Sequence, residues 1–113
     1  MTQQVTSMLE TYPKDLGGVD QEKLATCIAA CFECAQTCTA CADVCATTGK
    51  VLSRHTGYDA GLARAVLEAC RAACRTCGDE CAAHAGMHEH CRICAEACRR
   101  CEAACAELIG ALG

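Results

Sequence analysis

The chain has 113 residues, a length typical of one domain, and a formal net charge of −4. Lys and Arg form no cluster, which argues against nucleic acid or an anionic membrane as the main partner. No apolar run reaches transmembrane length, and the N-terminus has neither a basic start nor a hydrophobic stretch. We therefore expect a cytoplasmic protein with a single domain (1–113), divided into a leader segment (1–19) and a helical bundle (20–113).

The composition is dominated by cysteine. The chain has 15 Cys, whereas Leu, Ile, Val and Phe together supply 17 residues, too few to fill the interior of a domain. A free thiol packs like a small hydrophobic group. The sequence therefore predicts a core made largely of sulfur.

The predicted elements are all helical. Residues 2–18 suit a short helix ended by Pro13, and Asp20 is a favourable N-cap for the next helix. That helix is predicted over 21–54, followed by a turn at 55–59, a helix over 60–84, a linker at 85–87 and a helix over 88–112. Since no strand pattern is present, we expect an all-α antiparallel bundle of three long helices plus the short N-terminal segment.

The cysteines are spaced alternately three and four residues apart, which is a 3.5-residue repeat. Such a repeat keeps one seam of each helix turned toward its partners. The three predicted helices carry, in order, Cys27, Cys31, Cys34, Cys38, Cys41 and Cys45; Cys70, Cys74, Cys77 and Cys81; and Cys91, Cys94, Cys98, Cys101 and Cys105. The spacing thus predicts three inward-facing rows of thiols.

Antiparallel packing of three helices would give the bundle two different ends. One end would gather apolar side chains: Leu52, Leu62, Val66, Leu67, Leu108 and Leu112. The other would form a mouth of sulfur and imidazole: Leu24, Cys27, Cys81, His84, Met87, His88, His90 and Cys91. A histidine at a helix end is often simply solvated, but the clustering of His84, His88 and His90 around Met87 favours a role in guiding metal. His55, in the opposite turn, is expected to be plain surface.

Buried thiolates require compensating cations, and this chemistry favours Cu(I). Zinc takes about four thiolates per ion, which leaves each buried site with excess negative charge. Cu(I) is monovalent and can share thiolates, so a loaded core would be nearly neutral. An extended 3.5 repeat does not suit the loop-wrapped iron–sulfur clusters. Disulfides between residues three or four apart on a helix are excluded by distance, so only interhelical bridges are possible. No single cysteine is set apart for redox catalysis.

Three stretches, 27–43, 69–81 and 88–101, resemble the copper storage proteins, a family of cysteine-rich four-helix bundles, and in particular its cytosolic, signal-less actinobacterial kind. The resemblance covers about 21–112. It implies non-enzymatic, reversible storage of many Cu(I) ions, copper uptake at the histidine-bearing mouth, and assembly into a homotetramer. The alternative is a zinc or general soft-metal detoxification protein.

The sequence departs from this family at one place. The family has two cysteine-bearing helices joined by a turn before the final pair, whereas here a single stretch runs over 21–54. Compared with the family pattern, most of one helix and its hinge are missing between Cys41 and Cys45. We expect the fourth helix position to be filled by another chain, through helix exchange, or by residues 2–18.

Overall fold

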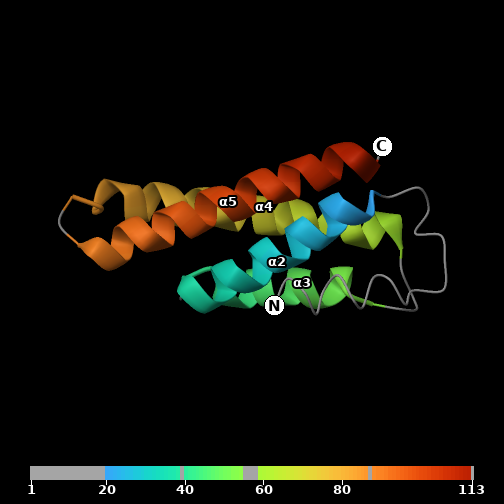
Figure 1. Cartoon of the computed structure of the whole chain (residues 1–113), viewed down its shortest axis with the longest axis horizontal. Helices are drawn as coiled ribbons and strands as arrows, with labels where there is room; N and C mark the ends of the chain where they lie inside the picture. Colours follow the sequence, from blue (N-terminus) through green and yellow to red (C-terminus); the bar gives the residue numbers. More distant parts are fainter. Residues whose placement is uncertain (1–19, 39, 55–58, 87, 113) are drawn as a thin grey trace.

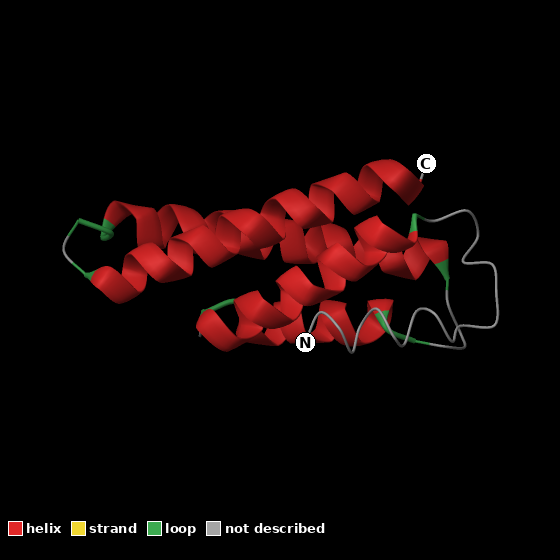
Figure 2. Cartoon of the chain, in the orientation of Figure 1, coloured by secondary structure: helices red, strands yellow, loops and turns green. Residues whose placement is uncertain are grey.

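In the computed structural model, residues 20–38, 40–54, 59–86 and 88–112 are described. They form four helices: α2 (Gln21–Thr37), α3 (Ala42–Leu52), α4 (Ala60–Ala83) and α5 (Glu89–Leu112). Figure 2 shows these helices, with no strand among the described residues. The predicted all-α class is confirmed. The expected helix within 2–18 lies outside the described residues, as do His55 and Met87.

The predicted single helix over 21–54 is wrong. α2 ends at Cys38, whose backbone is extended (φ −116°, ψ 113°), and α3 begins after Cys41. The chain reverses there, so that the Sγ atoms of Cys34 and Cys41 lie 3.3 Å apart. The two later helices match their predictions within one residue at each end.

The four helices form a closed bundle in which each helix contacts two others. α2 contacts α3 and α5, and α4 also contacts α3 and α5. The backbones of the two diagonal pairs, α2 with α4 and α3 with α5, do not approach each other as closely within the described residues. The fourth position is therefore occupied by α3 of the same chain. The expectation that another chain or residues 2–18 would fill it is wrong for this arrangement.

The helices differ in length, and this leaves one end of the bundle uneven. α4 and α5 have 24 residues each, against 17 in α2 and 11 in α3. At a rise of about 1.5 Å per residue, the α4–α5 pair is longer than α2 by roughly 10 Å. Figure 1 shows the α4–α5 hairpin extending past the turn between α2 and α3. Cys81 and Cys91, which lie on this extension, are only partly buried.

Helix starts and close contacts follow from local chemistry. The Asp20 carboxylate accepts hydrogen bonds from the backbone N–H groups of Glu22 and Lys23, and Asp59 accepts one from Leu62, so α2 and α4 both have side-chain N-caps. Between α2 and α3, the Phe32 ring packs against Gly49, where a Cβ atom would lie 2.9 Å from the ring. This glycine lets the two helices approach closely.

The opposite end of the bundle is apolar. Leu24, Leu52, Leu67 and Leu108 are fully buried there, one from each helix. Because the chain reverses at 38–41, Leu24 and Cys27 lie near this end, where Cys27 Sγ is 3.9 Å from Cys105 Sγ. Their predicted place at the sulfur and imidazole mouth is wrong. Leu62, expected in this cluster, is 40% exposed.

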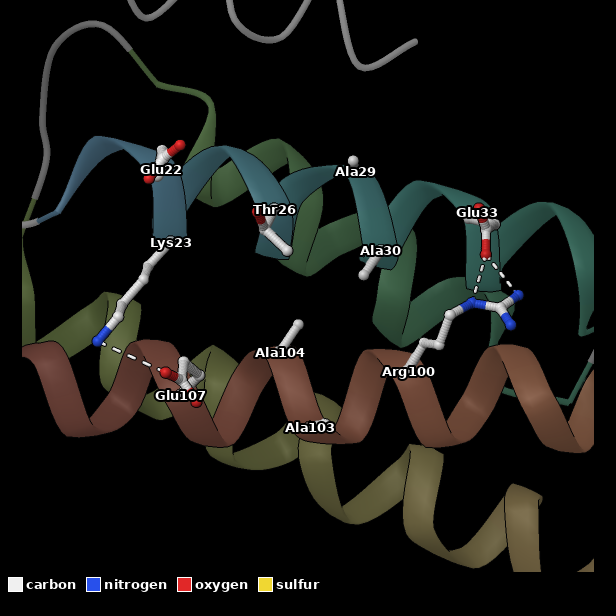
Figure 3. A pocket seen from close by; sticks show the side chains of 10 residues that line it. All are labelled: Glu22, Lys23, Thr26, Ala29, Ala30, Glu33, Arg100, Ala103, Ala104 and Glu107. Atoms are coloured by element: carbon white, nitrogen blue, oxygen red, sulfur yellow. Dashed lines mark hydrogen bonds and ion pairs between the residues drawn. The ribbon is translucent and has the colours of Figure 1, made fainter.

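The outer contact between α2 and α5 is built from small residues and ion pairs. Figure 3 shows alanines facing each other across a shallow groove, with Lys23 paired to Glu107 (3.5 Å) and Arg100 to Glu33 (2.6 Å). Exposed pairs of this kind contribute little to stability. The groove is lined by no cysteine or histidine. No helix in the described part is both long and apolar enough to cross a membrane.

Candidate metal centre

The interior of the bundle is a column of sulfur atoms. Thirteen of the fifteen cysteines are buried, and Thr48 is the one buried polar residue apart from them among the described residues. No Lys or Arg in the described part is buried. The predicted inward orientation of the cysteine rows is therefore confirmed for all but Cys81 and Cys91, which are partly exposed.

Twelve of these sulfurs form four groups of four, with the Sγ atoms in each group within 4.8 Å of one another. From the apolar end outward the groups are Cys31, Cys70, Cys101 and Cys105; Cys34, Cys45, Cys74 and Cys101; Cys34, Cys38, Cys41 and Cys98; and Cys38, Cys77, Cys94 and Cys98. We refer to them as groups 1 to 4. The members of each group come from at least three separate parts of the chain, which are either different helices or the turn at 38–41.

Neighbouring groups share members. Cys101 belongs to groups 1 and 2, Cys34 to groups 2 and 3, and both Cys38 and Cys98 to groups 3 and 4. Sulfur–sulfur distances across the shared members are short, for example 3.8 Å between Cys34 and Cys74 and 3.9 Å between Cys34 and Cys98. The groups therefore form one continuous chain of potential ligands instead of separate pockets.

The sulfurs titrate as coupled sets. Hydrogen bonds from Cys101 and Cys45 hold the pKa of Cys34 far below its usual value, and those from Cys101 and Cys105 do the same for Cys70. Burial, together with the hydrogen bond to Cys34, raises the pKa of Cys41 to about 12. Neighbouring S–H groups thus favour the thiolate form at some positions of the column, while burial favours the protonated thiol at others.

At the apolar end, hydrogen bonding with Cys105 and Cys31 lowers the pKa of Cys27 to about 5. We call the other end of the column, where the α4–α5 hairpin extends past α2 and α3 (Figure 1), the open end. There, burial and the negative charge of Cys77 raise the pKa of Cys81. A cation that enters the column must therefore displace protons from the thiols that keep them, and the sulfurs themselves supply the negative charge that attracts it.

One pair of sulfurs is covalently joined. Cys38, at the end of α2, forms a disulfide with Cys94 of α5, and their Cα atoms are 5.3 Å apart. This bridge is interhelical, as the sequence argument required of any bridge. The other thirteen cysteines are free. Sequence reasoning gave no signal for this pair, because a regular repeat does not reveal which rows meet.

The histidines lie at the surface. His84, His88 and His90 are exposed, the rings of His88 and His90 have centroids 5.4 Å apart, and His84 Nδ1 is 3.0 Å from the Glu80 carbonyl oxygen. None of the three joins a sulfur group within the described residues. The structure thus places them near the connection between α4 and α5 without bringing them into a ligand cluster.

The donor set fits a soft monovalent metal. Thiolates prefer Cu(I), zinc or iron–sulfur clusters, and the shared, linear arrangement of groups 1 to 4 suits ions that bridge common sulfurs. Isolated tetrahedral zinc sites would require four unshared ligands each. The geometry therefore favours a row of bridged Cu(I) ions as cargo.

Comparisons with known proteins agree with this chemistry. The sequence model of the copper storage protein family matches residues 33–110. The structure resembles that of Ccsp, the copper storage protein of Streptomyces lividans, loaded with 10 copper equivalents, at 55% identity and a TM-score of 0.91, covering 95% of this chain and 98% of that one.

Two further structures from Streptomyces lividans are similar. A cytosolic copper storage protein with five coppers matches at 56% identity and a TM-score of 0.81, covering 86% of this chain and 100% of that one. A histidine-to-alanine variant of Ccsp matches at 55% identity and 0.83, with the same coverage. No curated protein matches the chain. With its family model matched over most of its length and a sulfur-lined bundle, the chain belongs to the copper storage protein family.

Proposed function

We propose that this protein stores many Cu(I) ions on the thiolates inside its helical bundle and does not act as an enzyme. The observation that carries the proposal is the continuity of groups 1 to 4, in which Cys34, Cys38, Cys98 and Cys101 each belong to two groups. A shared thiolate can bridge two monovalent ions, so the column can hold a chain of copper ions in place of a few separate sites.

Charge balance supports the same metal. No buried Lys or Arg accompanies the buried sulfurs in the described residues, so ionised thiolates need the metal itself for compensation. One Cu(I) that replaces one thiol proton leaves the charge of the core unchanged. Loading can therefore proceed along the column without an accumulating electrostatic penalty.

Ligand roles follow from burial. The twelve cysteines of groups 1 to 4 and Cys27 are proposed as the storage ligands, and the partly exposed Cys81 and Cys91 as ligands at the open end. His84, Met87, His88 and His90 are proposed to guide copper toward that end. For the three described histidines, exposure and a position at or beside the connection between α4 and α5 support this role.

The setting of the protein is proposed from its relatives and its sequence. One similar structure is of a cytosolic copper storage protein, and cytosolic conditions keep thiols reduced and ready for metal. We further propose that residues 1–113 act as a single domain and that the chain assembles into a homo-oligomer, a tetramer by family resemblance. Light scattering of the metal-free and loaded forms measures the assembly directly.

The test is an anaerobic Cu(I) titration of the fully reduced chain against a chromophoric Cu(I) chelator. If the protein stores copper, it should bind many equivalents of Cu(I) before the coloured Cu(I)–chelator complex begins to accumulate. A control in which all thiols are first alkylated should bind almost none. A capacity near one ion per chain would contradict the storage function.

The rival function is storage or detoxification of zinc. It is tested by the same titration with Zn(II) and by competition between the two metals on one sample. If zinc saturates the protein and Cu(I) does not displace it, the zinc function replaces the proposed one.

A further inference from the structure

The disulfide between Cys38 and Cys94 joins two sulfurs that also belong to the candidate metal centre. Cys38 is a member of groups 3 and 4, and Cys94 is a member of group 4. A sulfur in a disulfide is no longer a thiolate and does not ligate Cu(I) as one. Formation of this single bond therefore removes one ligand from group 3 and two from group 4, while groups 1 and 2 keep all of theirs.

The position of the pair sets it apart from the deeper thiols. Cys38 ends α2 in an extended conformation, so its side chain leaves the helical repeat at the turn before α3. Cys94 lies near the start of α5, and its bond to Cys38 places it level with the end of α2. It is 9% exposed, the highest value among the buried cysteines, whereas Cys70, Cys101 and Cys105 are at 0%.

The backbone around the pair already suits a disulfide. The 5.3 Å between the two Cα atoms falls in the range that disulfides adopt. No helix has to move for the bond to form or break. The bond also ties α2 to α5 across 56 residues of chain, next to the open end through which metal would pass.

We infer that the Cys38–Cys94 pair is a redox switch that sets how much copper the bundle can hold. This inference rests on the proposed storage function and adds its regulation. With both thiols reduced, all four groups are available. With the disulfide formed, group 3 keeps three thiols and group 4 keeps two, so the outer part of the column holds fewer ions while groups 1 and 2 can fill completely.

A small hydroperoxide is the class of oxidant that fits the limited exposure of Cys94. The Cys94 thiolate attacks the peroxide oxygen, the O–O bond breaks, and a sulfenic acid forms with release of water or alcohol. The Cys38 thiol then attacks the Cys94 sulfur, the S–S bond forms, and the S–O bond of the sulfenic acid breaks with release of one water molecule. The two thiols lose two electrons in total, which the peroxide accepts. A dithiol reductant reverses the change by exchange through a mixed disulfide.

The test uses the full metal-free chain, reduced and then freed of reductant under anaerobic conditions. One equivalent of hydrogen peroxide is added, free thiols are alkylated, and the digest is analysed without reduction. We expect loss of two thiols and a linked pair of tryptic peptides, 24–50 with 93–99, with fragmentation placing the bond at Cys38 and Cys94. A bond elsewhere, or no bond, would overturn the inference.

The second readout is Cu(I) capacity of reduced and oxidised samples. Since the disulfide takes two thiols from groups 3 and 4 and none from groups 1 and 2, oxidation should lower the Cu(I) capacity by about two ions, and dithiothreitol should restore it. Equal capacities in the two states would overturn the switch. A low capacity already in the reduced state would count against storage itself, while the peptide linkage would still report on the pair.

Matched variants separate the switch from simple loss of a ligand. Cys94→Ser and Cys105→Ser each remove one buried thiol from α5, but only the first removes a partner of the disulfide. Cys94→Ser should have the same copper capacity before and after peroxide treatment. Cys105→Ser should lose capacity on oxidation as the unmodified chain does. If both variants respond to peroxide alike, the assignment of the switch to Cys94 is wrong.

Discussion

Cys101 and Cys105 lie one helical turn apart on α5 and are both fully buried, yet their surroundings differ. Cys101 belongs to groups 1 and 2, whereas Cys105 belongs to group 1 alone. A bridging thiolate supports two metal ions, so its loss weakens both. We therefore predict that Cys101→Ser lowers the Cu(I) capacity more than Cys105→Ser does.

The measurement is native mass spectrometry of both variants after loading with excess Cu(I) and desalting. Circular dichroism of the metal-free forms checks that each variant keeps its helices. Since serine is slightly smaller and nearly isosteric, neither change should unfold the bundle. Equal losses from the two variants would mean that shared membership has no effect on capacity.

Glycines provide a second residue-level prediction, about stability. Alanine in place of glycine inside a helix stabilises by roughly 0.5–1 kcal/mol when there is space for the Cβ atom. A Cβ atom at Gly110 would meet nothing within 4 Å, but one at Gly49 would lie 2.9 Å from the Phe32 ring. Overpacking costs about 1–3 kcal/mol. Gly110→Ala should therefore stabilise the metal-free protein, and Gly49→Ala should destabilise it.

Urea unfolding of the reduced, metal-free chain measures both effects. Adding Phe32→Leu to Gly49→Ala should recover part of the lost stability, because the ring that causes the clash is gone. If Gly49→Ala proves as stabilising as Gly110→Ala, the close contact between α2 and α3 is not the reason for a glycine at this position.

At the level of helices, the start of α2 depends on one side chain. Asp20 accepts hydrogen bonds from the backbone N–H groups of Glu22 (2.8 Å) and Lys23 (3.2 Å). Loss of such an N-cap costs about 1 kcal/mol. We predict that Asp20→Ala lowers the free energy of unfolding by about this amount, whereas Asp20→Asn, which keeps an acceptor oxygen, retains most of it. Thermal and urea unfolding compare the two, and equal losses would contradict a capping role.

The same helices show what a sequence can and cannot reveal. The 3.5-residue repeat predicted inward rows of thiols, since burial of small apolar side chains requires one inward face per helix. The repeat does not reveal the reversal at 38–41, because the spacings between Cys34, Cys38, Cys41 and Cys45 continue the 3.5-residue pattern without a break. No Gly or Pro marks the turn. Leu24 and Cys27 were consequently assigned to the wrong end of the bundle.

Partners across the core were also beyond the reach of the sequence. In a row of identical residues, sliding one helix by seven positions brings similar thiols into contact again, so the repeat does not fix which cysteines meet. Groups 1 to 4 and the Cys38–Cys94 pair depend instead on packing set by non-repeating residues. Gly49 against Phe32 and Gly78 against Cys98 and Arg99 are examples of such contacts.

For the whole molecule, the shared groups distinguish two metals by stoichiometry. Zinc prefers four thiolates of its own, and no more than two of the four groups can be chosen without a common cysteine; groups 1 and 4 are one such choice. The reduced chain should therefore hold about two Zn(II) ions in tetrahedral sulfur sites. Cu(I), which accepts shared thiolates, should bind in several-fold greater number.

Charge offers an independent check on the same prediction. Each tetrathiolate zinc site exchanges four protons for one divalent ion and so adds −2, which would take the formal charge of the chain from −4 to about −8 with two sites filled. When loading reaches one Cu(I) per deprotonated thiol, as shared thiolates allow, each ion replaces one proton and the charge stays at −4. Native anion-exchange chromatography should thus delay the zinc form and leave the copper form near the metal-free position. A copper form that shifts as far as the zinc form would mean that the ions do not share thiolates along the column.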